Sequence, residues 1–242
     1  MNSLAGKSAL ITGGARRIGR AIALTLARAG ADITLTYRTS SDEAVEAVDA
    51  IEQFGRRGFA VECNVRSEES VRAAIAATVA AHGRLDILVN NAAIFEAAPL
   101  DQLTLAQWDA VFETNARGPF LVAREALPHL RAARGRIVNL GSLGGLRPWA
   151  GHAHYCASKA ALHMLTQAQA KAFAPDVAVN CVAPGWIEQE GEAGPLSERF
   201  AAKAPMQRNG TAEDVAQAVL FFASAAAFIT GQILAVDGGL GL

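Results

Sequence analysis

The chain has 242 residues, of which 51% are hydrophobic and 19% are charged. This length fits one α/β domain, and the apolar content is too high for a disordered chain. The formal net charge of −1 excludes the strongly basic surface that binds nucleic acid or an anionic membrane. We therefore expect one domain, residues 1–242, with neither nucleic acid nor a membrane as partner.

Cysteine use and the apolar segments indicate the compartment. Cys63, Cys156 and Cys181 are widely spaced and odd in number, which fits neither a disulfide framework nor a zinc site. The N-terminus lacks the basic start and long apolar stretch of a signal peptide, and polar residues interrupt the apolar run 216–228. We expect a cytoplasmic protein without a membrane-spanning segment.

The hydrophobic pattern indicates the fold class. Short β-branched runs alternate with longer alanine-rich stretches of helical spacing, which is typical of a parallel sheet covered by helices on both faces. We therefore expect a single α/β, doubly wound (Rossmann) domain with a seven-stranded parallel sheet. The expected strands are residues 8–12, 32–37, 58–63, 85–89, 136–140, 177–182 and 233–236.

Helix starts are expected where an oxygen-bearing side chain precedes a helical run and a second polar side chain follows three residues later. Such a pair can satisfy the free backbone N–H groups of the first turn. The pairs in this chain are Ser40 with Glu43, Thr104 with Gln107, and Thr211 with Asp214.

Residues 184–210 break the alternation with three prolines, four glycines and the acids Glu188, Glu190 and Glu192. This composition predicts a long loop. Because long loops in compact domains are usually lids or binding loops, we expect it to bind the substrate.

The segment Thr-Gly-Gly-Ala-Arg-Arg-Ile-Gly, residues 12–19, lies where the first strand ends and the first helix begins. Backbone N–H groups and the positive end of a helix at this place can hold a pyrophosphate. Glycine also ends strands for steric reasons, so the position of the turn counts for more than its sequence. The expected dinucleotide contacts here are Gly13, Arg16, Arg17, Ile18 and Gly19.

The end of the second strand indicates which dinucleotide binds. An acidic residue there accepts a hydrogen bond from a free ribose 2′-hydroxyl and repels a 2′-phosphate. This chain instead has Arg38, Thr39 and Ser40, and Arg38 can pair with a dianion together with Arg16 or Arg17. We predict NADP(H) over NAD(H); the alternative is that these arginines are solvated surface charges.

Tyr155 and Lys159 are four residues apart in a chain with only two tyrosines and four lysines. On a helix this spacing places both side chains on one face. A phenol with a pKa of about 10 is a poor proton shuttle at neutral pH, and an ammonium about 4 Å away favours ionisation by about 4 kcal/mol. We expect Lys159 to lower the pKa of Tyr155. Ser142, after the fifth strand, can orient a substrate oxygen, although it can also be a turn-forming serine.

Four further motifs follow the predicted strands and helices: Asn90-Asn91-Ala92-Ala93, Asn115, Pro184-Gly185 and the terminal Val236-Asp237-Gly238-Gly239. Together with the glycine turn, Ser142 and the pair of Tyr155 and Lys159, they occur in the order and spacing of the short-chain dehydrogenase/reductase family, which the sequence resembles over essentially its whole length. The resemblance implies that Tyr155 is the general acid/base and that Ser142 polarises a substrate carbonyl. It also implies that Lys159 holds the nicotinamide ribose and lowers the tyrosine pKa, and that Asn115 keeps a proton-relay water in place.

The resemblance also implies further cofactor contacts. The family's aspartate after the third strand is Asn64 here, which can still hydrogen-bond an amino group. The family's threonine after Pro-Gly has no counterpart, and Gln189 is the candidate to replace its contact with the nicotinamide carboxamide. The implied contacts are Asn64, Val65, Asn91, Ala92, Ala93, Tyr155, Lys159, Pro184, Gly185 and Ile187.

Departures from the family pattern bear on the substrate. Arg17 replaces the usual middle glycine of the first turn, which resembles the NADPH-dependent pteridine-reductase branch, and Phe95 occupies the place of that branch's pterin-stacking aromatic residue. Ser142 stands where that branch commonly carries aspartate, and it resembles the oxoacyl-carrier-protein reductases instead. The expected substrate contacts are Phe95, Ser142, Trp149 and Trp186.

We therefore expect an NADPH-dependent oxidoreductase that transfers a hydride to a ketone or 3-oxoacyl substrate, with Tyr155 as the acid. The alternatives are a pteridine or dihydropteridine reductase and, in another class, an inactive NADP-sensing regulatory module. No metal is expected, because His152 and His154 lack a third ligand in a recognised pattern. Alanine-rich helices around 104–131 and 152–173 can pack across a symmetry axis, and the family is commonly tetrameric, so we expect a homotetramer.

Overall fold

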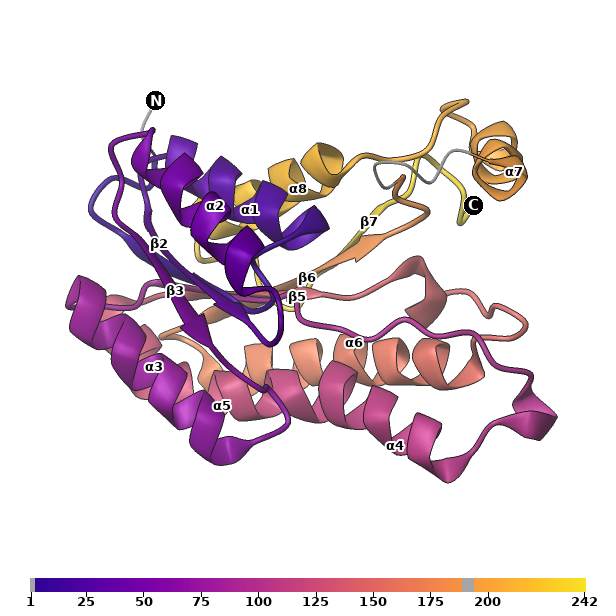
Figure 1. The fold of residues 1–242 in the computed structure, drawn as a ribbon, viewed down its shortest axis with the longest axis horizontal. Coiled ribbons are helices and arrows are strands. Elements are labelled where there is room, and N and C mark those ends of the chain that lie inside the picture. The colour runs from indigo at the N-terminus through magenta and orange to yellow at the C-terminus, as the bar shows by residue number, and fades with distance from the viewer. Residues whose placement is uncertain (1–2, 189–193) are drawn as a thin grey trace.

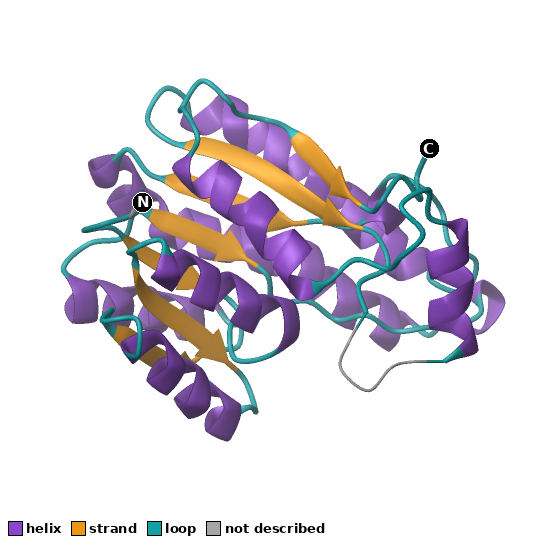
Figure 2. Ribbon diagram, turned by 90° about the horizontal axis from the view of Figure 1, so that it is seen from above, coloured by secondary structure: helices purple, strands orange, loops and turns teal. Residues whose placement is uncertain are grey.

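The computed structural model describes residues 3–188 and 194–242, which form three layers. A seven-stranded sheet lies between two layers of helices (Figure 1, Figure 2). The strand order is β3-β2-β1-β4-β5-β6-β7, and all neighbouring strands are parallel. The expected doubly wound fold is therefore confirmed. The strands are β1 (Ser8–Ile11), β2 (Asp32–Tyr37), β3 (Gly58–Glu62), β4 (Ile87–Asn90), β5 (Arg136–Leu140), β6 (Ala178–Pro184) and β7 (Ile233–Val236).

The helices divide between the two faces of the sheet (Figure 1). One face carries α1 (Arg17–Arg28), α2 (Ser41–Glu52) and α8 (Ala212–Ser224). The other carries α3 (Glu68–His82), α4 (Leu105–Phe112), α5 (Gly118–Ala133) and α6 (Ala153–Phe173), and α7 (Pro195–Lys203) lies near the C-terminus (Figure 1). A π-helical turn, Glu113–Arg117, joins α4 to α5. Each face buries its own cluster of aliphatic side chains, which stabilises the sheet from both sides.

Three of the expected strands match the structure at both ends, and the other four differ by one or two residues. Thr104 and Thr211 form the expected capping boxes at the starts of α4 and α8. The expected cap at Ser40 is wrong, because its side chain makes no capping hydrogen bond. The backbone of Ser40, at φ −106° and ψ 60°, lacks the extended conformation from which a cap side chain reaches the first turn.

The expectation of a loop over 184–210 is also wrong in part, because α7 lies within it. Pro195 is the first residue of α7. Proline is tolerated there, since the N–H it lacks would have no partner inside the helix. An isolated parallel bridge between Ile187 and Gly210 joins the two ends of this region. Gln189 lies outside the described residues.

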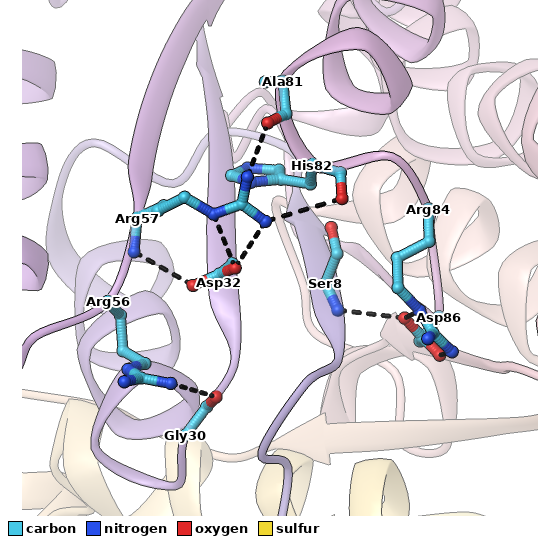
Figure 3. Close-up of polar contacts among 9 residues, drawn as sticks. All are labelled: Ser8, Gly30, Asp32, Arg56, Arg57, Ala81, His82, Arg84 and Asp86. Carbon is cyan, nitrogen blue, oxygen red and sulfur yellow. Dashed lines mark hydrogen bonds and ion pairs between the residues drawn. The ribbon is translucent and has the colours of Figure 1, made fainter.

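Two polar clusters hold the amino edge of the sheet (Figure 3). Asp86, only 2% exposed, accepts hydrogen bonds from the backbone N–H of Ser8 and from two nitrogens of Arg84. Arg57 pairs with Asp32 at the start of β2 and donates to the carbonyl oxygen of Ala81 at the end of α3. Both clusters lie at the opposite edge from the strand ends where ligands of this fold bind.

None of the helices in the described part of the chain is both long enough and apolar enough to cross a bilayer.

Candidate functional site

A continuous cavity of about 1410 Å³ runs along the carboxyl edge of the sheet. Because the strands are parallel, the residues that follow them meet at this edge, on both sides of the point where the strand order reverses between β1 and β4. Apart from Gln189, which lies outside the described residues, all the residues expected to contact the cofactor or the substrate line this cavity. Among the four expected catalytic residues, Ser142, Tyr155 and Lys159 line it and Asn115 does not.

The glycine turn after β1 is fixed by the segment after β4. The Asn91 side chain donates to the carbonyl oxygens of Thr12 and Gly13, both at 2.9 Å. The Thr12 hydroxyl in turn accepts from the backbone N–H groups of Asn91 and Ala92. A Cβ on Gly19 would overlap the Gly13 carbonyl oxygen, so only glycine fits there. Sequence reasoning missed the part played by Thr12, whose hydroxyl has no local partner that would have signalled it.

The N-terminus of α1 faces the cavity with no acidic residue in its first turn, which suits an anion. Its first residue, Arg17, has φ +51°, in the left-handed region that favours glycine. A non-glycine residue in this region costs roughly 1 kcal/mol. This strain explains why the resembled family usually has glycine here. In this chain the position is strained, and the Arg17 side chain adds a cation to the cavity wall.

Two further cations lie at this end of the cavity. Arg16 pairs with Glu43 at 3.6 Å, and both side chains are exposed. Arg38, at the end of β2, forms no ion pair within the described ranges, and Thr39 and Ser40 lie beside it on the cavity wall. Because the side chain of Arg38 is not neutralised by a carboxylate, this end can accept a dianion.

Tyr155 and Lys159 lie on the cavity face of α6, as their spacing predicts. The Lys159 ammonium is 5.8 Å from the centre of the Tyr155 ring and donates to the carbonyl oxygen of Leu140 at 2.7 Å. Burial raises the pKa of Tyr155, and the Ser142 hydroxyl acts in the opposite direction. The pKa of Tyr155 therefore lies above its ordinary value, in the direction opposite to the expectation, because burial of the phenol outweighs the groups that favour its ionisation.

Lys159 itself is 3% exposed, and burial lowers its pKa to about 8. At neutral pH it still carries a proton. The Leu140 carbonyl oxygen stabilises the ammonium by accepting its hydrogen bond, and no carboxylate is among the groups that shift the pKa of Lys159.

Ser142 lies just after β5, and its hydroxyl oxygen accepts a hydrogen bond from the backbone N–H of Gly144 at 3.0 Å. The hydroxyl hydrogen is then free to donate to another oxygen. Ser142 and Tyr155 line the same cavity, and the Ser142 hydroxyl influences the pKa of Tyr155, so both can face one substrate oxygen.

Asn115 lies in the π-helical turn and is completely buried. Its amide oxygen accepts from Ile94 N at 2.8 Å, and its amide nitrogen donates to Ile94 O at 2.9 Å and to the Ser158 hydroxyl at 3.1 Å. Ser158 donates to the carbonyl oxygen of Tyr155. The Asn115 side chain therefore joins the segment after β4 to α6, the helix that carries Tyr155, and its expected role in holding a proton-relay water stays a prediction.

Aromatic rings surround the substrate end of the cavity. Phe95 stacks on His152 at 4.7 Å and meets Tyr155 edge-on at 4.8 Å. Trp186 stacks on Phe200 of α7 at 4.3 Å, and Trp149 lies 6.2 Å from both Phe95 and Phe200. The sequence did not indicate Phe200, because its helix lies in the region expected to be a loop.

Within residues 3–188 and 194–242, no three His, Cys, Asp or Glu side chains are grouped as a metal site would require. One ring face of His152 is occupied by Phe95. The hydroxyl of Ser142, the phenol of Tyr155 and the ammonium of Lys159 are polar groups that line the cavity.

Comparison with known proteins agrees with this geometry. The family model described as "Enoyl-(Acyl carrier protein) reductase" matches residues 13–241. A 3-oxoacyl-[acyl-carrier-protein] reductase from Staphylococcus aureus strain Mu50 is 39% identical over 240 residues, which cover 97% of this chain and 98% of that protein.

Two solved structures share the whole fold. A dehydrogenase/reductase from Sinorhizobium meliloti 1021 superimposes with a TM-score of 0.94 at 40% identity, covering 100% of this chain and 97% of the other. A blue fluorescent protein from a metagenomic library, in complex with NADPH, superimposes with a TM-score of 0.94 at 36% identity, covering 99% of this chain and 100% of the other.

Proposed function

The chain belongs to the short-chain dehydrogenase/reductase family, and from this premise we propose that it transfers a hydride from NADPH to the carbonyl carbon of a ketone or 3-oxoacyl substrate. One observation carries the proposal. Ser142, Tyr155 and Lys159 line one part of a cavity whose other wall is formed by the glycine turn and Arg38. A proton donor and a dinucleotide-binding turn thus share one continuous space.

The residues present fit NADP(H). Gly13 and Gly19 line the cavity, where a backbone without side chains can lie close to a pyrophosphate, and the open N-terminus of α1 favours its charge. Arg16 and Arg38 suit a 2′-phosphate, and no acidic residue follows β2 directly. The NADPH found in the blue fluorescent protein supports the same choice. When bound, the cofactor supplies the hydride.

The chain's own residues supply the proton and hold the substrate oxygen. Tyr155 is protonated at neutral pH because burial raises its pKa, so it can donate to the oxygen as negative charge develops there. Ser142 donates its hydroxyl hydrogen to the same oxygen. The Lys159 ammonium lies close enough to stabilise the phenolate left after transfer.

The choice among substrates rests on three observations. Ser142 and the likeness to a 3-oxoacyl-[acyl-carrier-protein] reductase favour a ketone or 3-oxoacyl group. Pterin reduction is less well supported, because His152 covers one face of the Phe95 ring that would stack on a pterin. The intact set of Ser142, Tyr155 and Lys159 disfavours an inactive sensor.

We also propose a cytoplasmic homotetramer. Leu105 and Trp108 on α4 and Phe120 on α5 expose apolar surface, as do Phe228 and Leu242 in the last part of the chain. Exposed apolar side chains on several elements support association, because contacts between subunits would cover them. Light scattering of the purified protein tests the assembly, and a monomer would contradict it.

The activity test measures NADPH consumption by the purified protein with a 3-oxoacyl thioester, a small diketone and dihydrobiopterin. We expect turnover with the carbonyl compounds, its loss in Tyr155→Phe and its near-loss in Ser142→Ala. Both variants should bind NADPH nearly as well as the parent protein. Turnover of dihydrobiopterin alone would support the pterin alternative. NADPH binding without turnover of any of the three would support the sensor, and full activity in Tyr155→Phe would refute the assigned acid.

A further inference from the structure

His163 is a buried histidine that the proposed chemistry does not use. It lies on α6 one turn after Lys159 and is 4% exposed. Its ring fits between two glycines on either side of Ser142. A Cβ on Gly145 would come within 2.6 Å of the ring carbon Cε1, and a Cβ on Gly141 would overlap Nε2. The loop that carries Ser142 is thus shaped around this imidazole.

The ring contacts the backbone of Ser142 directly. His163 Nε2 accepts a hydrogen bond from the Ser142 backbone N–H at 3.4 Å, while the Ser142 hydroxyl oxygen accepts from Gly144 N at 3.0 Å. The serine is therefore held at two points, its backbone by the imidazole and its hydroxyl oxygen by the loop. Together these contacts set the direction in which the hydroxyl hydrogen can donate.

The imidazole must be neutral for Nε2 to accept, and its surroundings keep it so. Burial and the nearby Lys159 charge lower the pKa of His163 to about 4. The other titratable group in this contact region, Cys181, is a neutral thiol, since burial raises its pKa to about 12. No carboxylate is among the groups that shift the pKa of His163.

We propose that His163 is a positioning residue, whose neutral imidazole holds the backbone of Ser142 so that the serine hydroxyl faces the substrate carbonyl. This inference rests on the proposed reductase function. It differs from a packing role, because a side chain of the same size that cannot accept a hydrogen bond would fill the space without orienting the serine.

The test compares His163→Leu, which fills the space without an acceptor, with His163→Gln, which restores an acceptor oxygen. We expect kcat to fall by roughly tenfold to hundredfold in His163→Leu, as misplacement of a positioning group does, and to recover in part in His163→Gln. The dissociation constant for NADPH should not change in either variant. A matched control is Thr166→Val, one turn further along α6, which removes a buried acceptor for Asn139 and leaves the Ser142 loop alone.

The pH profile separates positioning from packing. The Ser142 hydroxyl holds the pKa of Tyr155 below the value that burial alone would give. Displacing Ser142 should therefore raise that pKa and move the alkaline limb of kcat to higher pH in His163→Leu and in Ser142→Ala. In Thr166→Val the alkaline limb of kcat should lie at the same pH as in the parent protein. The groups that face the phenol are Ser142, Cys156 and Lys159, and the His163 substitutions leave all three in the chain.

A measurement on the parent protein guards against variants that fail to fold. Nitrogen NMR with labelled histidine should show His163 neutral, with its proton on Nδ1 and a bare Nε2. A proton on Nε2 would overturn the inference, as would a His163→Leu variant with the parent kcat and pH limb, or a folded His163→Gln no better than His163→Leu. If instead Ser142→Ala and Tyr155→Phe keep full activity, the proposed function itself fails.

Discussion

The Lys159 ammonium donates a 2.7 Å hydrogen bond to the carbonyl oxygen of Leu140, the last residue of β5. This contact ties α6, which carries Tyr155, to the strand that leads into Ser142. Lys159 thus connects two elements of the site and also places a positive charge there. Its burial lowers its pKa to about 8.

The buried lysine makes stability depend on pH. Between pH about 8 and about 10.5 the unfolded chain keeps the Lys159 proton and the folded chain releases it, so raising the pH favours folding in this window. We expect the free energy of unfolding of the parent protein to rise with pH relative to that of Lys159→Met. Urea denaturation of both proteins from pH 8 to 10 measures the difference, in which shared titrations cancel. A difference that falls with pH would contradict the assignment.

Arg38 should decide the choice of dinucleotide. Replacing it by Asp removes an unneutralised cation and introduces an acceptor for a free 2′-hydroxyl. We expect the KM for NADPH to rise roughly tenfold to hundredfold in Arg38→Asp, with a lower KM for NADH, since loss of a charged contact costs about 1.5–3 kcal/mol. Steady-state kinetics with both dinucleotides tests this. A parent enzyme with a lower KM for NADH than for NADPH would contradict the prediction.

Arg17 combines backbone strain with a charge, and two substitutions separate them. Arg17→Ala removes the side chain and keeps a Cβ at φ +51°, whereas Arg17→Gly removes the strain as well. We expect Arg17→Gly to be more stable than Arg17→Ala by about 1 kcal/mol in thermal or chemical unfolding. Both should bind NADPH more weakly than the parent. Equal stability of the two variants would mean that the left-handed conformation carries no strain.

Asp86 should stabilise the fold without affecting the chemistry. Asp86→Ala leaves the buried N–H of Ser8 without its acceptor and breaks the pair with Arg84, at the edge opposite the site (Figure 3). We expect a loss of about 1–3 kcal/mol in the free energy of unfolding, with kcat per folded molecule unchanged. Arg84→Ala is the matched control. It should cost less, because about half of the Arg84 side chain is exposed and Ser8 keeps its acceptor.

Much of the fold and the location of the site follow from local patterns in the sequence. Short β-branched runs between alanine-rich helices predicted the parallel sheet, and parallel strands place their carboxyl ends at one edge. The spacing of Tyr155 and Lys159 predicted a shared helix face, because helical periodicity is a property of neighbouring residues. The capping pairs at Thr104 and Thr211 are equally local, and both form.

Only the tertiary structure decided how these residues act. Whether the pKa of Tyr155 rises or falls depends on the balance between burial and charges brought in by other segments, and here burial prevails. The partners of Asn115 and the contact between His163 and Ser142 join residues more than twenty positions apart. Such contacts leave no periodicity in the chain. Residue pattern thus determined which groups reach the edge of the sheet, and long-range packing determined their protonation and their direction.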